Sequence, residues 1–312
     1  MPRFKASILL YWLLPVMMFV SACQQGPKTH DQKVAEGLLS FEKFFNIHYT
    51  EVYRRQANGL VFNEYGYQLE PQWRINFVSN DSVSIFSPKK QRFLNFALSR
   101  GYDSIFNTAR VWFKARKMTK DSLLLEILEP HGDSLDINGA KVYLTFYADS
   151  YIKNVLHTDA ETLQRPSRND TLYIKKLIAA SDTNLQKAFA GREPVEFISR
   201  SANATAKPIE TEPTIFNMYN PEDYLNPAYN ITIKKAYMNF FYTFTVIVDK
   251  SGELHYGKPL VPFTDEKSKE AYIRTSKAIM DGYLKTYFAI IPGKTLSLPH
   301  ASEVTVNITG IK

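Results

Sequence analysis

Residues 244–254 read FTVIVDKSGEL, and this stretch decides how the C-terminal part of the chain folds. Phe244, Val246 and Val248 alternate with other residues, as they do in a strand with one buried face. Asp249 and Gly252 then supply the residue types that turns prefer, and the alternation resumes beyond them. The pattern predicts a β-hairpin.

The sequence after this hairpin predicts one helix and one more strand. Residues 265–287 place apolar side chains near one face at helical spacing. The turn residues Pro292, Gly293 and Lys294 follow, and residues 304–308 alternate again as a final strand. The order is strand, hairpin, helix, turn, strand.

This order, together with FTVIVDKSGEL, PGK at 292–294 and VTVNITGI at 304–311, resembles the C-terminal domain of TonB-type energy transducers. The resemblance implies recognition by strand addition, in which an extended segment of a partner pairs with an exposed sheet edge. The implied partner edge is the last strand, with Val304, Val306 and Ile308. TonB proteins also have a membrane-spanning N-terminus and a long Pro/Lys-rich arm, and this chain departs from that pattern, so the resemblance does not extend to energy transduction.

The sequence before residue 190 predicts a sheet with helices. Residues 34–55 have an apolar stripe that predicts an amphipathic helix, residues 72–87 predict a hairpin, and residues 89–100 predict a second helix ended by Gly101. Further strands are predicted at residues 110–116, 122–128, 141–147 and 171–177.

We therefore predict an α+β fold of two domains, mainly antiparallel sheets with helices packed on one face. Five prolines between residues 191 and 228 break any long element, and RSANATAK at 200–207 is the predicted exposed linker. The predicted segments are a signal peptide (1–22), a tether (23–33), an N-terminal α+β domain (34–190), a Pro-rich linker (191–228) and a TonB-like α+β domain (229–312).

The N-terminus predicts lipid anchoring. Arg3 and Lys5 precede an apolar run that ends near Val20, which is typical of a secretory signal. Residues 20–23, VSAC, resemble the lipobox of bacterial lipoproteins, and that resemblance implies cleavage before Cys23, a diacylglycerol on its sulfur and an acyl chain such as palmitate on the new N-terminus. Acyl chains hold a protein at a bilayer because each buried methylene contributes about 0.8 kcal/mol.

The composition argues against disulfide bonds and against binding to nucleic acid. Cys23 is the single cysteine, so no intramolecular disulfide can form. Loss of Arg3 and Lys5 with the signal lowers the formal charge from +7 to +5, and no dense basic block predicts binding to nucleic acid.

Few residues have the types and spacing of a catalytic, metal-binding or cofactor-binding site. The six histidines show no metal-binding spacing, and no cofactor motif is present, so we predict no metal and no cofactor. The densest ionisable group lies at residues 129–136, where His131, Asp133 and Asp136 could form a weak acid–base or binding site. Pro-His-Gly-Asp is also ordinary turn chemistry, and the turn is the favoured interpretation.

Enzymatic activity stays open, but a non-catalytic role is favoured. We predict an outer-membrane lipoprotein that faces the periplasm and docks an outer-membrane or periplasmic protein through its TonB-like domain. The alternative is an envelope hydrolase or a cell-wall or glycan-binding lipoprotein with its site near residues 129–136. A third interpretation is a purely structural role at the outer membrane.

Overall fold

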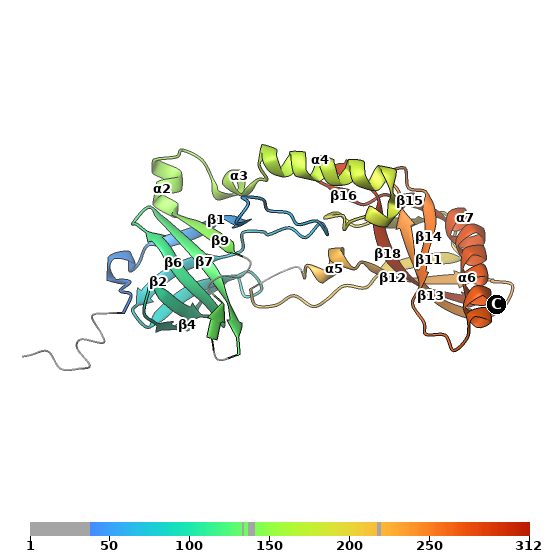
Figure 1. Cartoon of the computed structure of the whole chain (residues 1–312), viewed down its shortest axis with the longest axis horizontal. Helices are drawn as coiled ribbons and strands as arrows, with labels where there is room; N and C mark the ends of the chain where they lie inside the picture. Colours follow the sequence, from blue (N-terminus) through green and yellow to red (C-terminus); the bar gives the residue numbers. More distant parts are fainter. Residues whose placement is uncertain (1–37, 133, 137–140, 217–219) are drawn as a thin grey trace, which may run out of the picture.

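The computed structural model describes residues 38–132, 134–136, 141–216 and 220–312. Figure 1 shows an elongated molecule in which two β-rich lobes lie side by side along the long axis. The first described residues are in one lobe, and the C-terminus lies at the far end of the other. Large, mainly antiparallel sheets dominate the fold, as the sequence predicted. No helix among the described residues is long and apolar enough to cross a membrane.

The N-terminal lobe is a closed barrel of eight antiparallel strands. Each strand from β1 to β7 pairs with the next along the chain, β9 pairs with both β7 and β1, and β8 forms only a short hairpin with β7. Closure leaves the barrel without a free sheet edge. The strands are β1 (His48–Gln56), β2 (Arg74–Ser79), β3 (Ser82–Ser87), β4 (Arg92–Arg100), β5 (Ile105–Thr108), β6 (Val111–Met118), β7 (Ser122–His131), β8 (Ser134–Asp136) and β9 (Val142–Ala148).

Aromatic side chains fill the barrel. In a barrel of about eight strands, alternate residues point inward and the interior is just wide enough for side chains to fill. Phe77, Phe106, Phe113 and Phe146 are buried in this way. Phe41, which precedes β1, stacks on Phe77 with ring centroids 4.4 Å apart. The interior is therefore a packed core.

Two helices predicted for this lobe were wrong. Residues 38–55 form the short 3₁₀ helix η1 (Glu42–Phe44) and β1, and residues 92–100 form β4. Apolar spacing over so short a window fits a helix or a strand, and hydrogen bonding of β1 and β4 to neighbours on both sides decides the outcome. The predicted hairpin at 72–87 and the predicted strands at 110–116, 122–128 and 141–147 are confirmed.

Helices connect the two lobes. They are α2 (Asp149–Asn154), α3 (Ala160–Gln164), α4 (Arg168–Thr183) and η2 (Leu185–Lys187), and α4 runs along one side of the molecule from lobe to lobe (Figure 1). The strand predicted at residues 171–177 was wrong, because these residues lie in α4. A capping box starts this helix: the Ser167 hydroxyl accepts from the Asp170 N–H and the Asp170 carboxylate accepts from the Ser167 N–H. That Ser-x-x-Asp signal was present in the sequence.

The C-terminal lobe is a five-stranded sheet with a helix on one face. The strand order is β11-β12-β18-β13-β14, with β12 and β18 parallel and the other pairs antiparallel. Ile279 and Leu284 from the helical face share one buried cluster with Val246 and Val306 of the sheet. The elements are β10 (Glu196–Ser199), β11 (Ala204–Pro208), α5 (Glu222–Leu225), β12 (Ala228–Lys234), β13 (Phe240–Val248), β14 (Leu254–Pro259), α6 (Glu266–Ile279), the π-helical turn η3 (Met280–Leu284), α7 (Lys285–Tyr287), β15 (Phe288–Ile291), β16 (Lys294–Thr295), β17 (Leu298–Pro299) and β18 (Ser302–Ile311).

The hairpin, helix and final strand predicted for this lobe are confirmed, but the predicted partner edge was wrong. β18 is the central strand and is hydrogen-bonded to β12 on one side and to β13 on the other. Val304, Val306 and Ile308 are fully buried. A strand with such an apolar face contributes most to the stability of the fold when it is covered along its whole length. The outer strands of the sheet are β11 and β14.

Residues 191–216 and 220–228, the described parts of the segment predicted as a Pro-rich linker (191–228), belong to the fold. β10 pairs with β15, and β11 pairs with β12, so residues 204–207 of the predicted exposed linker belong to the C-terminal sheet. Pro208 ends β11, where an outer strand tolerates the missing N–H. Phe216 packs against Trp73 and Phe96 of the barrel lobe. Strand pairing and the packing of Phe216 thus hold this part of the chain against both lobes.

A third apolar cluster joins the lobes. Val61 and Phe62 come from the barrel lobe, Ile174 from α4, and Phe189 from the start of the C-terminal lobe, and all four are buried together. These four side chains are removed from water only when the lobes are in contact. The cluster therefore stabilises the contact between the two lobes.

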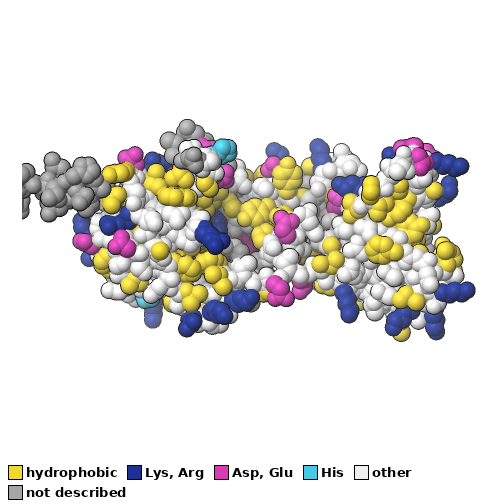
Figure 2. Space-filling model, turned by 90° about the horizontal axis from the view of Figure 1, so that it is seen from below, with side chains coloured by type: hydrophobic (Ala, Val, Ile, Leu, Met, Phe, Trp, Pro, Cys, Tyr) yellow, Lys and Arg dark blue, Asp and Glu magenta, His cyan; other side chains and the backbone are white. Residues whose placement is uncertain are grey.

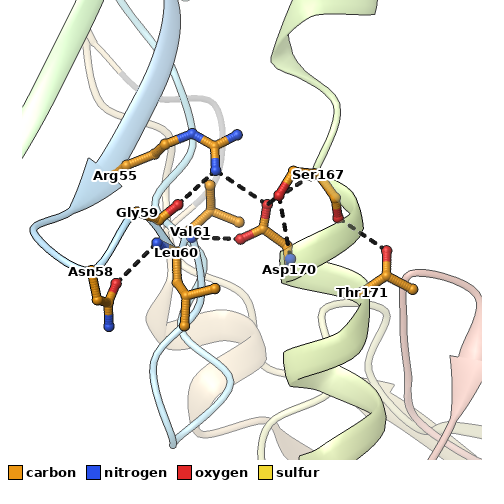
Figure 3. Close-up of polar contacts among 8 residues, drawn as sticks. All are labelled: Arg55, Asn58, Gly59, Leu60, Val61, Ser167, Asp170 and Thr171. Carbon is orange, nitrogen blue, oxygen red and sulfur yellow. Dashed lines mark hydrogen bonds and ion pairs between the residues drawn. The ribbon is translucent and has the colours of Figure 1, made fainter.

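The carboxylate of Asp170 stabilises this junction through hydrogen bonds and an ion pair (Figure 3). It is buried and accepts hydrogen bonds from the Val61 N–H (2.9 Å), the Ser167 N–H (2.7 Å) and the Ser167 hydroxyl (2.6 Å), while Arg55 lies 3.3 Å away. Burial by itself raises the pKa of Asp170, but these hydrogen bonds and the charge of Arg55 outweigh it and lower the pKa. The ionised group therefore ties α4 to the loop that precedes Val61.

We predict that Asp170→Asn lowers the free energy of unfolding by about 2–4 kcal/mol, because the amide can no longer accept from every donor that faces it. Urea unfolding at pH 7 measures the loss. Asp159→Asn is the matched control, since Asp159 caps the short helix α3 in an exposed position. Equal losses in the two variants would contradict the role given to Asp170.

Candidate functional site

A tight hairpin of the barrel lobe, residues 60–69, reaches the C-terminal lobe. The side-chain oxygen of Asn63 accepts from the N–H groups of Tyr65 (3.0 Å) and Tyr67 (2.9 Å), which shapes the turn. Gly66 has a φ of +86°, and a Cβ there would lie 2.4 Å from the Ala190 carbonyl oxygen. Only glycine therefore allows the hairpin tip to approach Ala190 so closely.

Polar contacts hold this hairpin against the other lobe. The Ala190 N–H donates to the Tyr65 carbonyl at 3.0 Å, and the Gln68 N–H donates to the Tyr224 hydroxyl at 2.9 Å. Burial is the main reason that the pKa of Tyr224 rises to about 12, so its hydroxyl stays neutral. Arg192 packs over the Tyr224 ring and pairs with a glutamate of the barrel lobe, Glu70, at 2.8 Å.

Three adjoining hollows form a groove between the hairpin and the C-terminal sheet, which we call the inter-lobe groove. Their volumes are about 640, 210 and 130 Å³. Glu303 lines all three, and Leu225 and Asn226 are shared by the two larger hollows. The groove thus combines residues from both lobes.

The lining of the inter-lobe groove suits binding. Tyr65 presents an aromatic ring that is 68% exposed, and Asn226 adds an exposed amide. Lys258 of β14 and Glu303 of β18 are the charged groups among the residues that line it, and both are exposed. This mixture of aromatic side chains, amides and two opposite charges can hold a ligand by stacking and hydrogen bonds. Figure 2 shows hydrophobic and acidic side chains side by side in the zone between the lobes.

A buried histidine supports one wall of the groove. The ring of His300 stacks on the lining residue Phe189 with centroids 3.7 Å apart. His300 Nδ1 lies 3.0 Å from the Ala301 carbonyl oxygen, so Nδ1–H donates, and Nε2 accepts from the Thr295 hydroxyl at 3.0 Å. Burial lowers the pKa of His300 from 6.5 to about 4 and outweighs the opposing effects of Ala301 and Asp182.

The residues proposed from the sequence do not converge on this groove. His131 is exposed at the end of β7 and Asp136 lies in β8, so both belong to a hairpin whose turn includes Gly132 at a φ of +58°. Asp133 and the proposed lipidation site, Cys23, lie outside the described residues. The inter-lobe groove includes no residue of that hairpin. The turn interpretation fits this geometry better than a binding site.

Sequence reasoning missed the groove residues because they are far apart in the chain. Tyr65, Lys258 and Glu303 come from three separate segments, and nothing in their spacing links them. One local signal was readable: Asn63 and Gly66 have the spacing of a tight turn.

Within the described residues, one further group brings metal-binding atoms together. Asp249, Glu253 and His255 offer ligand atoms within 4.8 Å of one another. Asp249 also accepts from the Ser251 N–H at 2.8 Å and the Glu253 N–H at 3.0 Å, and the net effect lowers its pKa to about 2 despite an opposing contribution from burial. These bonds hold the β13–β14 turn, so the cluster has a structural role without any ion.

A separate hollow of about 430 Å³ lies on the barrel lobe beside α2 and α3. The Thr50 hydroxyl at its edge donates to Asp149 at 2.6 Å. Next to it, the buried carboxylate of Glu51 pairs with Arg54 at 2.7 Å and accepts from the Trp73 N–H at 3.0 Å. These polar groups satisfy one another and fix the strand β1, which is a structural role.

No family model and no curated protein matches this chain. Among solved structures, the bovine lipocalin allergen Bos d 2 is similar at 11% identity, with 47% of this chain and 87% of that chain covered and a TM-score of 0.22. A likeness of this size carries no argument about function.

We predict that His300 makes stability depend on pH. The unfolded chain binds a proton below pH 6.5 and the folded chain does so only below about 4, so stability is complete above 6.5 and falls as the pH drops through this window. The loss is about 3 kcal/mol. Urea unfolding between pH 7.5 and 4.5 measures it.

His300→Gln should flatten this dependence, whereas His131→Gln, at an exposed histidine, should leave it unchanged. An unaltered pH slope in His300→Gln would show that other groups cause it.

Proposed function

We propose that the protein is a lipid-anchored binding protein of the cell envelope that holds a partner in the inter-lobe groove. The observation that carries the proposal is that Tyr65 of the barrel lobe and Lys258 of the C-terminal lobe line adjoining hollows that share Glu303. The resemblance of VSAC to a lipobox supports the anchor. Gln24 in place of Asp after the cysteine, and the absence of an acidic run there, favour an outer-membrane, periplasm-facing location. No covalent chemistry is assigned to the groove.

The partner that fits best is an extended polypeptide segment of an outer-membrane or periplasmic protein. β14 is an outer strand of the sheet, and its residues Gly257 and Lys258 line the groove. We infer that a segment pairs with the outer edge of β14 while its side chains extend toward Glu303, which lines the same hollow as Gly257 and Lys258. This keeps the TonB-like mode of recognition and moves it from β18 to β14.

Glycan binding is the second candidate, and the exposed ring of Tyr65 beside Asn226 favours it. Sugar rings stack on aromatic faces, and amides bond to their hydroxyls. The earlier alternative, a hydrolase or glycan site at residues 129–136, has less support because His131 and Asp136 lie on a hairpin at the surface.

We further propose that the two lobes are separate domains of an α+β protein. Their main buried clusters share no residue, which supports the division. The boundary then falls before β10, because β10 and β11 pair with strands of the C-terminal lobe. Calorimetry of Asp170→Asn, which weakens the junction, should resolve two unfolding transitions, and one cooperative transition would speak against separate domains.

We predict that the mature wild-type chain carries acyl mass on Cys23 and fractionates with the outer membrane. Cys23→Ser removes the sulfur that the lipid needs, so this variant should keep its signal peptide or become soluble. Intact-mass analysis with membrane fractionation of both chains is the measurement. An unlipidated, soluble wild-type protein would contradict the lipid anchor but would not test the proposed binding in the groove.

Groove variants test the binding proposal. Tyr65→Ala and Glu303→Lys should each lower recovery of a cross-linked partner by about tenfold or more, as changes at interface centres do. Tyr102→Ala is the control, because Tyr102 is a similarly exposed tyrosine on a turn of the barrel. Unchanged recovery in both groove variants would rule out the groove, while loss of sedimentation with cell-wall glycan in the same variants would select the glycan candidate.

A further inference from the structure

An exposed apolar patch lies at the end of the C-terminal sheet, and we call it the terminal patch. Tyr237 and Met238 stand in the loop between β12 and β13, Phe241 is near the start of β13, and Ile311 ends β18. Their exposed fractions are 67%, 49%, 64% and 47%. Four large apolar side chains so exposed at one site are more than the scattered single residues of an ordinary surface.

The backbone holds these four residues together. The Ala236 N–H donates to the Ile311 carbonyl at 2.9 Å, and the Lys312 N–H donates to the Asn239 side chain at 2.8 Å. Phe241 is opposite Thr309 in the β13–β18 pair. The loop and both strand ends are therefore neighbours at this end of the sheet.

A layer of aromatic rings on the helix-covered face of the sheet supports the loop part of the terminal patch. Phe240 packs against Tyr283 of η3 with centroids 5.8 Å apart, and Tyr237 lies 6.3 Å from Phe240. The Tyr237 N–H also donates to the Tyr283 hydroxyl at 3.3 Å. Phe240 itself fits closely over Gly310, where a Cβ would lie 2.2 Å from its ring. The patch is thus presented on a packed base.

Positive charge surrounds the terminal patch. Lys234, Lys235 and Lys312 flank it and are exposed, and none of them forms an ion pair with another described residue. Residues 234–243 and 307–312 contain no aspartate or glutamate. Exposed apolar and aromatic side chains flanked by three lysines are complementary to a bilayer that carries anionic headgroups.

We propose that the terminal patch binds an anionic lipid surface. Tyr237, Met238 and Phe241 enter the boundary between headgroups and acyl chains, and the lysines contact the phosphates. The patch lies at the end of the molecule opposite the first described residues (Figure 1), so this contact is separate from any anchor at Cys23. It also does not rest on the function proposed for the groove.

The single cysteine permits a direct test. In the full chain with Cys23→Ser, a polarity-sensitive fluorophore is attached at Met238→Cys, or at Tyr102→Cys as the control on the barrel lobe. Vesicles contain either phosphatidylcholine alone or phosphatidylcholine with phosphatidylglycerol. The probe at 238 should brighten several-fold and shift to the blue with the anionic vesicles, while the probe at 102 should not.

Substitutions then identify the residues that bind. Phe241→Ser and Tyr237→Ser should abolish the brightening, and both side chains are exposed enough that the fold is retained. Each lysine changed to alanine should weaken binding to anionic vesicles roughly fivefold. No change at 238, or equal changes at 238 and 102, would overturn the proposal. Brightening that follows protein concentration without vesicles would also overturn it, because a second copy would then cover the patch.

Discussion

A buried carboxylate must be surrounded by donors, and the arrangement of the two lobes follows from how Asp170 meets this requirement. Its donors come from the barrel strand that carries Arg55, from the loop that ends at Val61 and from the start of α4. Because these donors come from separate segments, they hold the start of α4 against the barrel lobe. The apolar cluster around Ile174 and Phe189 then forms along the same helix.

This junction also creates the inter-lobe groove. Once α4 is in place, Ala190 lies against the hairpin tip at Gly66, and Tyr65 stands opposite the end of the C-terminal sheet. The barrel contributes a rigid, edge-free support, and the C-terminal lobe contributes the open strand β14 and the charged residues. The groove and the terminal patch lie on different parts of that lobe, so one molecule can hold a partner and touch a lipid surface.

Elements that depend on local interactions could be predicted from the sequence. Elements that depend on contacts between distant segments could not. The hairpin at 244–254, the helix at 265–287 and the strand at 304–308 were predicted because turns and one-sided burial leave a local pattern. The helices expected at 34–55 and 89–100 were wrong, since pairing with distant strands overrode local spacing. The groove had no local pattern, because Tyr65 and Glu303 are brought together only by the lobe junction.

Alternation of apolar residues, several turns and the apolar faces of the C-terminal strands were readable from neighbours along the chain. Only the tertiary structure decided that the barrel closes through β1 and β9 and that β18 takes the centre of its sheet. Both depend on backbone hydrogen bonds between segments far apart in sequence. The apolar face of Val304, Val306 and Ile308 indicated burial but not which strands would provide it.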